Sequence, residues 1–180
     1  MKRNNPIHID IISAAALIAV CVVGRLLPHS ANFTPLAACA LFAGFLVSRR
    51  AIAFAVPVAA MIMSDAFIGG YNIGVMLIVY AAMAMPVFMR PLLGDGRNPL
   101  RIGGCALASS IAFFLATNFA HWALMGMYDR TLSGLVSCYV AAIPFFRNTL
   151  AGDMFFAAVL FGGYAFLARP AVRPALQQTA

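Results

Sequence analysis

The stretch Tyr-Val-Ala-Ala-Ile-Pro-Phe-Phe-Arg-Asn-Thr-Leu-Ala-Gly-Asp-Met-Phe, residues 139–155, places an arginine and an aspartate inside an otherwise apolar run. A charged side chain inside a bilayer costs on the order of 3 kcal/mol, so such residues are usually paired or line a water-filled cavity or a binding site. Arg147 and Asp153 are therefore the first candidate functional residues.

The composition of the whole chain agrees with a membrane setting. Hydrophobic residues make up 63% of the 180 residues, charged residues make up 9%, the mean hydropathy is +0.93, and glutamate is absent from the sequence. These values are typical of polytopic membrane proteins rather than soluble domains. Because a spanning helix needs about 20 residues, we expect one transmembrane domain over residues 1–168 and a short cytoplasmic tail over 169–180.

The distribution of charges argues against nucleic-acid binding, and the spacing of the cysteines favours a packing role. The net charge of +7 comes from basic residues scattered singly or in pairs, so it indicates membrane topology rather than nucleic-acid binding. The basic N-terminus resembles a signal peptide, but the apolar run that follows continues to Leu27, which favours an uncleaved first span. The four cysteines lack CxxC spacing and are expected to be packing residues, with a metal or disulfide role as the alternative.

Apolar runs separated by turns predict an all-α bundle of six transmembrane helices, at residues 7–27, 35–48, 51–67, 73–93, 101–125 and 148–168. Thr34 and Pro35 resemble the cap and first residue of the second helix. That helix covers only about 21 Å, less than the hydrocarbon core of about 30 Å. We therefore expect the connection 28–34 to dip below the membrane surface. A short half-inserted helix over 131–143 is expected to end at Pro144.

The distribution of basic residues predicts the orientation. With six spans and both termini inside, the inner side receives Lys2, Arg3, Arg49, Arg50, Arg90, Arg97, Arg101, Arg169 and Arg173. The outer side receives Arg25, Arg130 and Arg147. This bias predicts cytoplasmic termini. Asp10, near the start of the first span, is expected to be a solvated charge.

Polar side chains at membrane depth gather in the outer half of this topology. They are Arg25, His29, Asn32, Asp65, Asn72, Asn118, His121, Tyr139, Arg147, Asn148 and Asp153, with aromatic neighbours Phe33, Tyr71, Trp122, Tyr128, Phe145 and Phe146. The asymmetry predicts a cavity that opens to the outside. In the alternative, Arg25 or Arg147 pairs with Asp65 or Asp153 only to hold helices together.

Catalytic and metal motifs are absent from the sequence. The segment Leu-Ala-Gly-Asp153 lacks a glycine that intramembrane aspartyl proteases carry, and no HExxH motif or Ser/His/Asp order is found. His29 and His121 lie on the same predicted side, but spacing fixes no third ligand, so no metal site is predicted. We expect neither catalytic residues nor a cofactor.

Several motifs resemble a known family. They are Arg25-Leu-Leu-Pro-His, Asn32-Phe-Thr-Pro-Leu-Ala, Ser64-Asp65, Asn118-Phe and, most specifically, Cys138-Tyr-Val-Ala-Ala-Ile-Pro-Phe-Phe-Arg-Asn-Thr with Gly152-Asp153. Over residues 20–168 the chain resembles a family of uncharacterised small bacterial membrane proteins carried as transport proteins.

More distantly, the six short spans and the proline at the entry to the last one resemble the substrate-binding S components of energy-coupling factor vitamin transporters. That resemblance implies a ligand cavity near the outer face. It also implies a transmembrane coupling subunit and two ATPase subunits as partners, although some S-component relatives are thought to work alone. An Ala-xxx-Ala pattern docks on the coupling subunit in that family, and Ala15 and Ala19 match it loosely.

We therefore expect a non-catalytic, multi-pass protein of the bacterial inner membrane that binds a small vitamin-like or polar solute and takes part in its uptake. Arg25 and Arg147 would bind anionic or amide groups, and Asp65 and Asp153 would pair with them or bind cations. The full set expected to bind substrate is Arg25, His29, Asn32, Asp65, Asn118, His121, Trp122, Tyr139, Arg147, Asn148 and Asp153. The alternative function is a structural or assembly subunit of a membrane complex.

Overall fold

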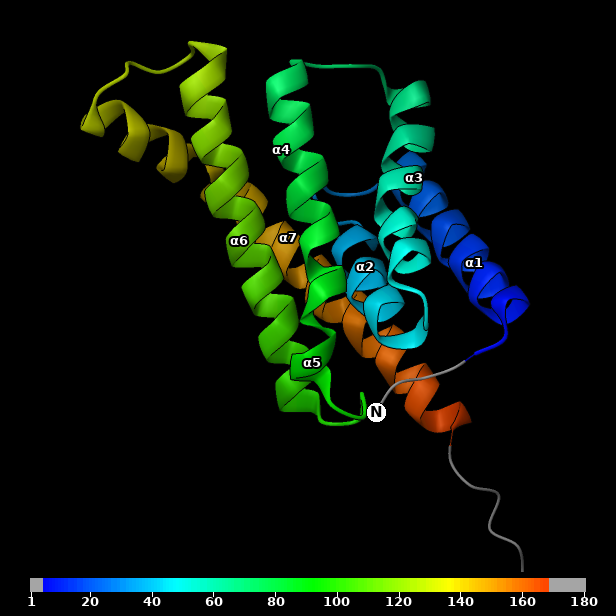
Figure 1. Ribbon diagram of the computed structural model, residues 1–180. Helices are drawn as coiled ribbons and strands as arrows, with labels where there is room; N and C mark the ends of the chain where they lie inside the picture. The colour runs from blue at the N-terminus through cyan, green and yellow to red at the C-terminus, as the bar shows by residue number, and fades with distance from the viewer. Residues whose placement is uncertain (1–4, 169–180) are drawn as a thin grey trace, which may run out of the picture.

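The computed structural model describes residues 5–168, which form helices and connecting loops with no strand among them (Figure 1). Five stretches are long and apolar enough to cross a membrane. They are α1 (Ile7–Leu26), α3 (Arg50–Ile68), the run of α4 (Ile73–Ala84), η1 (Met85–Met89) and α5 (Arg90–Leu93), then α6 (Pro99–Met125) and α7 (Leu132–Leu167). The apolar helix α2 (Leu36–Leu46) is shorter. The predicted all-α class is confirmed, and the predicted tail over 169–180 lies outside the described residues.

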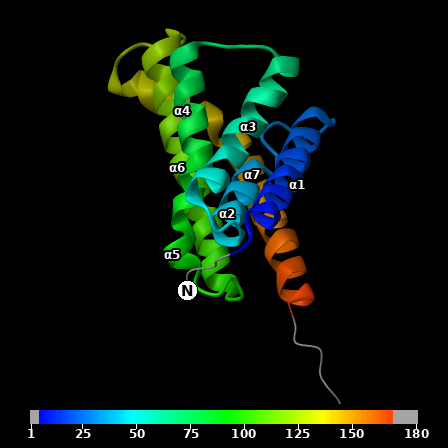
Figure 2. The same ribbon diagram turned by 45° about the vertical axis from the view of Figure 1, so that its right-hand side comes forward.

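The helices run back and forth between two ends of the bundle. The start of α1, the turn at 47–49, the loop at 94–98 and the end of α7 lie together at what we call the terminal end (Figure 1). The loops at 69–72 and 126–131 lie at the opposite end, which we call the loop end. The view turned by 45° shows the same division (Figure 2).

Helix α2 forms the centre of the bundle. It contacts α1, α3, α4, α6 and α7, and all of residues 36–45 are buried. The Phe42 ring packs edge-on against Phe161 of α7, with 5.0 Å between ring centroids. Gly44 lets η1 approach closely, because a Cβ atom there would lie 2.3 Å from the carbonyl oxygen of Val87. The cysteines of this core and its surroundings are buried and free, as packing residues would be.

Side-chain caps fix where three of the helices begin. The side-chain oxygens of Asn72, Asn98 and Thr131 accept hydrogen bonds from first-turn backbone N–H groups of α4, α6 and α7, at distances between 3.0 and 3.2 Å. The predicted Thr34 cap is wrong, because Pro35 precedes α2 and no side chain caps that helix.

The predicted helix break at Pro144 is also wrong. One helix, α7, runs without interruption through Pro144, so residues 132–143 are the first part of this helix and not a separate one. A proline inside a helix costs about 3 kcal/mol in water, but packing against neighbouring helices makes it tolerable in membrane helices. Here α6 contacts α7 on both sides of the proline, since the Tyr139 hydroxyl donates to the Leu115 carbonyl at 2.7 Å and the Ser110 hydroxyl donates to Asp153 at 2.6 Å.

The connection between α1 and α2 packs against the middle of α7. The Asn148 side chain donates a 3.0 Å hydrogen bond to the Ala31 carbonyl. A Cβ atom on Gly152 would lie 3.2 Å from the backbone nitrogen of Thr34, so only a residue without a side chain fits there comfortably. The connection therefore lies beside the middle of the longest helix rather than beyond its end.

Asp10 corrects another expectation. Its side chain is 0% exposed and accepts backbone hydrogen bonds from Ser48 at 3.0 Å and Arg49 at 3.1 Å. The Arg49 guanidinium lies 3.1 Å from the same carboxylate, and the Asn5 amide donates to it at 3.3 Å. Asp10 is therefore a buried anchor that holds the turn between α2 and α3 against α1, not a solvated charge.

Candidate functional site

A cavity of about 450 Å³ lies beside the first turn of α2, on the side toward the loop end. We call it the main cavity. Because α2 has only 11 residues, it fills part of the depth of the bundle and leaves this space unfilled. The polar side chains that line the cavity are Arg25, His29, Asn32, Thr34, Tyr71, Thr149 and Asp153, and its apolar lining is Leu36, Met61, Ile68, Val79, Met83 and Phe113.

Arg25, in the last turn of α1, is held against α3. Its Nη1 atom lies 2.8 Å from Oδ1 of Asp65 and donates hydrogen bonds to the Ser64 hydroxyl and to the Met61 sulfur. The contact with Oδ1 of Asp65 is ionic, since its geometry is not that of a hydrogen bond. Oδ2 of Asp65 accepts a 2.8 Å hydrogen bond from the Tyr80 hydroxyl. Arg25 and Asp65 therefore form one of the ion pairs that the sequence analysis considered.

Asp153, on α7, has a different environment. The residue is 4% exposed, and Oδ2 accepts a 2.6 Å hydrogen bond from the Ser110 hydroxyl of α6. Within residues 5–168, Oδ1 has no hydrogen-bond partner and no basic side chain forms an ion pair with the carboxylate. The carboxylate lines the main cavity. Asp153 is therefore a nearly buried carboxyl group whose described protein partner is one neutral hydroxyl.

Two smaller hollows extend from the main cavity, one after the other. The first, of about 130 Å³, shares Asn32, Phe113 and Thr149 with the main cavity and reaches Asn118. The second, of about 300 Å³, shares Asn118 with the first and is also lined by His121. Asn118 and His121 therefore lie along a row of hollows that begins at the main cavity.

Three other predicted site residues connect segments of the fold. The Trp122 indole N–H donates at 2.9 Å to a backbone carbonyl of the loop between α6 and α7. The Tyr139 hydroxyl donates at 2.7 Å to a carbonyl of α6, and the Asn148 amide donates at 3.0 Å to the connection between α1 and α2. None of these three side chains lines the main cavity.

Arg147 lies apart from the cavity. Its side chain is on the exposed surface of α7, outside the lining of the main cavity and the two hollows beside it. It has no hydrogen-bond or ion-pair partner within residues 5–168. At 3.6 residues per turn, the six residues to Asp153 correspond to about one and two-thirds turns, so the two side chains point to different faces. The expected convergence of Arg147 and Asp153 at one site is not found.

Sequence reasoning missed Ser110, Tyr80 and Thr149. A serine inside an apolar helix usually bonds to the carbonyl four residues earlier. The Ser110 oxygen does lie 3.1 Å from the Ala106 carbonyl, but its one proton is shared with the closer Asp153 oxygen. Its second contact, with Asp153, depends on how α6 and α7 are paired. The signal available in the sequence was the polar pair at 109–110 in the middle of an apolar span.

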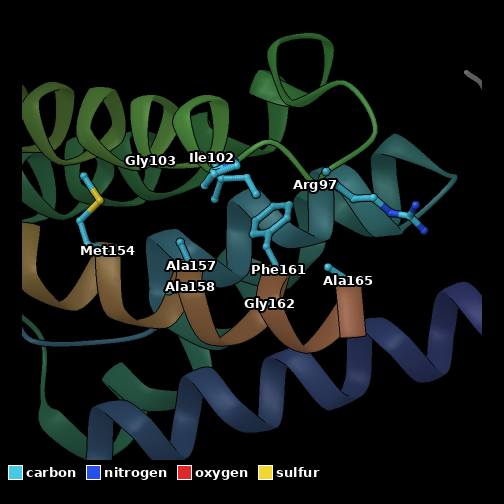
Figure 3. A pocket seen from close by; sticks show the side chains of 11 residues that line it. Arg97, Ile102, Gly103, Met154, Ala157, Ala158, Phe161, Gly162 and Ala165 are labelled. Atoms are coloured by element: carbon cyan, nitrogen blue, oxygen red, sulfur yellow. The ribbon is translucent and has the colours of Figure 1, made fainter. Parts of the chain in front are cut away.

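A separate groove, of about 350 Å³, lies between the start of α6 and the end of α7 (Figure 3). Ile102 and Phe161 meet in it, while the Arg97 side chain points away and donates to the Ala168 carbonyl at 3.0 Å. The remaining lining is apolar or glycine, so this groove lacks the converging polar groups of the main cavity. The main cavity is therefore the better candidate for a solute site.

Five apolar helices of spanning length, gathered around a short buried helix and a cavity with charged lining, define a multi-pass α-helical membrane protein. Within that class, the chain belongs to DUF6580, a family of unknown function, whose family model matches residues 5–176. No curated protein and no solved structure matches the chain. The function therefore has to be argued from the cavity itself.

Proposed function

We propose that this protein binds a small polar or vitamin-like solute in the main cavity and takes part in its uptake across the bacterial inner membrane. Asp153 is the observation that carries the proposal. A carboxylate that is 4% exposed and has one neutral hydrogen-bond partner is expensive to keep in a membrane protein. A volume of about 450 Å³ lies in the range of small-molecule sites, so a solute has room to satisfy the open carboxylate oxygen.

In this proposal the chain crosses the membrane six times. Helix α2 crosses only the inner half, and the connection at 27–35 covers the rest of that pass within the bundle. The terminal end faces the cytoplasm because basic residues concentrate there, namely Arg49, Arg50, Arg90, Arg97 and Arg101. The main cavity then opens toward the outside.

The residues of the cavity would share the work of binding. Arg25, His29 and Asn32 offer hydrogen-bonding groups on the wall formed by α1 and the connection that follows it. Asp65 acts through Arg25, because the Tyr80 hydroxyl holds the Asp65 carboxylate and this carboxylate pairs with the guanidinium. Asp153 contributes the open carboxylate oxygen on the facing wall. The mechanism would be alternating exposure of this one site, without a chemical step.

A coupling partner belongs to the same proposal. Ala15 and Ala19 lie on the exposed surface of α1, and small residues at this spacing let another helix approach closely. A transmembrane coupling subunit with two ATPase subunits would supply the energy. Cross-linking from cysteines introduced at these two positions, in native membranes, would identify the protein that docks there.

Uptake can be tested without knowing the solute in advance. The medium of the host bacterium and of a strain lacking this gene would be compared by mass spectrometry during growth. We expect at least one small solute to remain in the medium of the deletion strain, and to disappear when the wild-type gene is restored but not when the Asp153→Asn gene is. Identical media in all strains would count against uptake.

Arg147 supports a second function, that of an assembly subunit. A lipid-facing arginine costs on the order of 3 kcal/mol in a helix centre, and an acidic group on another protein would offset that cost. In this alternative, Arg147→Gln would release a partner from the complex purified from native membranes. If the purified complex keeps its composition after that substitution, the assembly reading is contradicted.

A further inference from the structure

The two acidic side chains near the main cavity differ in whether they have a basic partner. The positive charge of Arg25 on α1 is already compensated, because the Asp65 carboxylate on α3 lies 2.8 Å from its guanidinium. Asp153 is left with the Ser110 hydroxyl, which carries no charge. The described lining of the cavity therefore contains one carboxyl group without a basic partner, at a residue that is 4% exposed.

The two charged positions belong to separate walls. Arg25 bonds to α3 through Ser64, whereas Asp153 bonds to α6 through Ser110. Helices α3 and α6 do not contact each other in the described chain, and α4 packs against both. Figure 1 shows α4 between them. A solute lying in the cavity would thus meet a carboxylate on one side and a paired guanidinium on the other.

We propose that the solute is an organic cation whose positively charged nitrogen pairs with Oδ1 of Asp153 and whose other end carries a carbonyl or carboxylate group directed at Arg25. This proposal rests on the proposed function, since it specifies the ligand of the same cavity. A charged nitrogen would offset the uncompensated carboxylate with a strong charge-assisted hydrogen bond. Arg25 keeps N–H groups beyond Nη1 that have no partner within residues 5–168.

The walls of the cavity favour an organic cation over a bare metal ion. Hard metal ions require several oxygen ligands, and the described residues contain no group of three or more His, Cys, Asp or Glu side chains that could hold one. Met61, Met83 and Phe113 give the cavity an apolar and aromatic lining. Such surfaces accommodate the carbon skeleton of an amine, and aromatic rings attract cations.

The test is a thermal-shift screen of the purified full-length protein against a panel of metabolites sorted by charge at pH 7. The panel contains amines with a carbonyl or carboxylate group, the same amines after N-acetylation, and anions and neutral compounds of matched size. We expect the stabilising compounds to be amines, and their N-acetylated forms to be inactive. Compounds that stabilise the protein would then be titrated against three variants.

Asp153→Asn should weaken binding of the amines roughly 30-fold or more, because it removes the charge while an amide oxygen can still accept from Ser110. Ser110→Ala keeps the charge and should retain a preference for cations, which guards against a folding defect in the first variant. Arg147→Gln should bind like the wild type, since Arg147 lies outside the cavity.

Three results would overturn the inference. If the stabilising compounds are neutral or anionic, or if amines bind Asp153→Asn as tightly as the wild type, the cation assignment is wrong while solute binding stands. If no compound of any charge class stabilises the protein, both this inference and the proposed function lose their support.

Discussion

Arg25 and Asp65 form an ion pair, with 2.8 Å between Nη1 and Oδ1, that ties the end of α1 to α3. Their side chains are 16% and 8% exposed, so removal of one partner leaves the other charge largely buried. We predict that Arg25→Met lowers the free energy of unfolding by about 3 kcal/mol, and that the double variant Arg25→Met/Asp65→Leu recovers at least half of that loss. Unfolding in mixed detergent micelles would measure it, with the exposed Arg130→Gln as a control. If the losses in free energy of unfolding simply add in the double variant, the two side chains are not energetically coupled and the buried ion pair is contradicted.

Asp10 should matter for stability but not for binding. Its carboxylate accepts two backbone hydrogen bonds and pairs with Arg49 at the terminal end, far along α1 from the main cavity. Asp10→Ala should lower the free energy of unfolding by about 3 kcal/mol, because the turn loses its charged acceptor. Solute binding by the folded fraction should stay unchanged. A variant with normal stability and impaired binding would contradict the anchoring role.

Gly152 should be sensitive to size. A side chain there meets the backbone of Phe33 at 3.3 Å, so Gly152→Leu should push the connection between α1 and α2 away from α7 and distort the main cavity. Gly163→Leu is the matched control on the same helix, since a Cβ atom at that position meets nothing within 4 Å. We expect Gly152→Leu to reduce solute binding at least about tenfold, the equivalent of 1.4 kcal/mol. Equal binding by both variants would show that the connection does not shape the site.

Ser110 should position Asp153. Ser110→Ala removes a hydrogen bond to a charged acceptor, which is worth about 1.5–3 kcal/mol. The neighbouring Ser109→Ala is the control, because its hydroxyl bonds mainly to the carbonyl of Cys105 on its own helix. We expect Ser110→Ala, and not Ser109→Ala, to lower both stability and solute affinity. If the two substitutions have the same effect, the link between α6 and α7 at Asp153 is unimportant.

The apolar runs predicted most of the helices well. The first span was expected at 7–27 and is found at Ile7–Leu26, and the fifth was expected at 101–125 and is found at Pro99–Met125. These bounds follow from local features such as the Asn98 cap. Proline is also a local signal, and it usually indicates a helix break. At Pro144 the helix continues, because α6 packs along α7 on both sides of the proline. That information lies in the pairing of helices and not in the segment itself.

The predicted helix break at Pro144 also explains why Arg147 was expected to lie in the same site as Asp153. With a predicted break at Pro144, Arg147 fell in a connecting segment without a helical phase, so it was free to converge on Asp153. Continuous α7 places the two side chains on different faces. The sequence did predict Arg25, His29, Asn32 and Asp153 as lining residues. It could not distinguish the paired aspartate from the unpaired one, because that difference depends on Arg25 contacting α3.

The most direct test of the central claim is native mass spectrometry of the full-length protein, purified gently from its own host as the wild type, Asp153→Asn and Arg147→Gln. We predict that the wild type and Arg147→Gln retain the same small molecule and that Asp153→Asn, though folded, does not. If Asp153→Asn retains that molecule as fully as the wild type, or if Arg147→Gln is the variant that loses it, the main cavity is not the binding site.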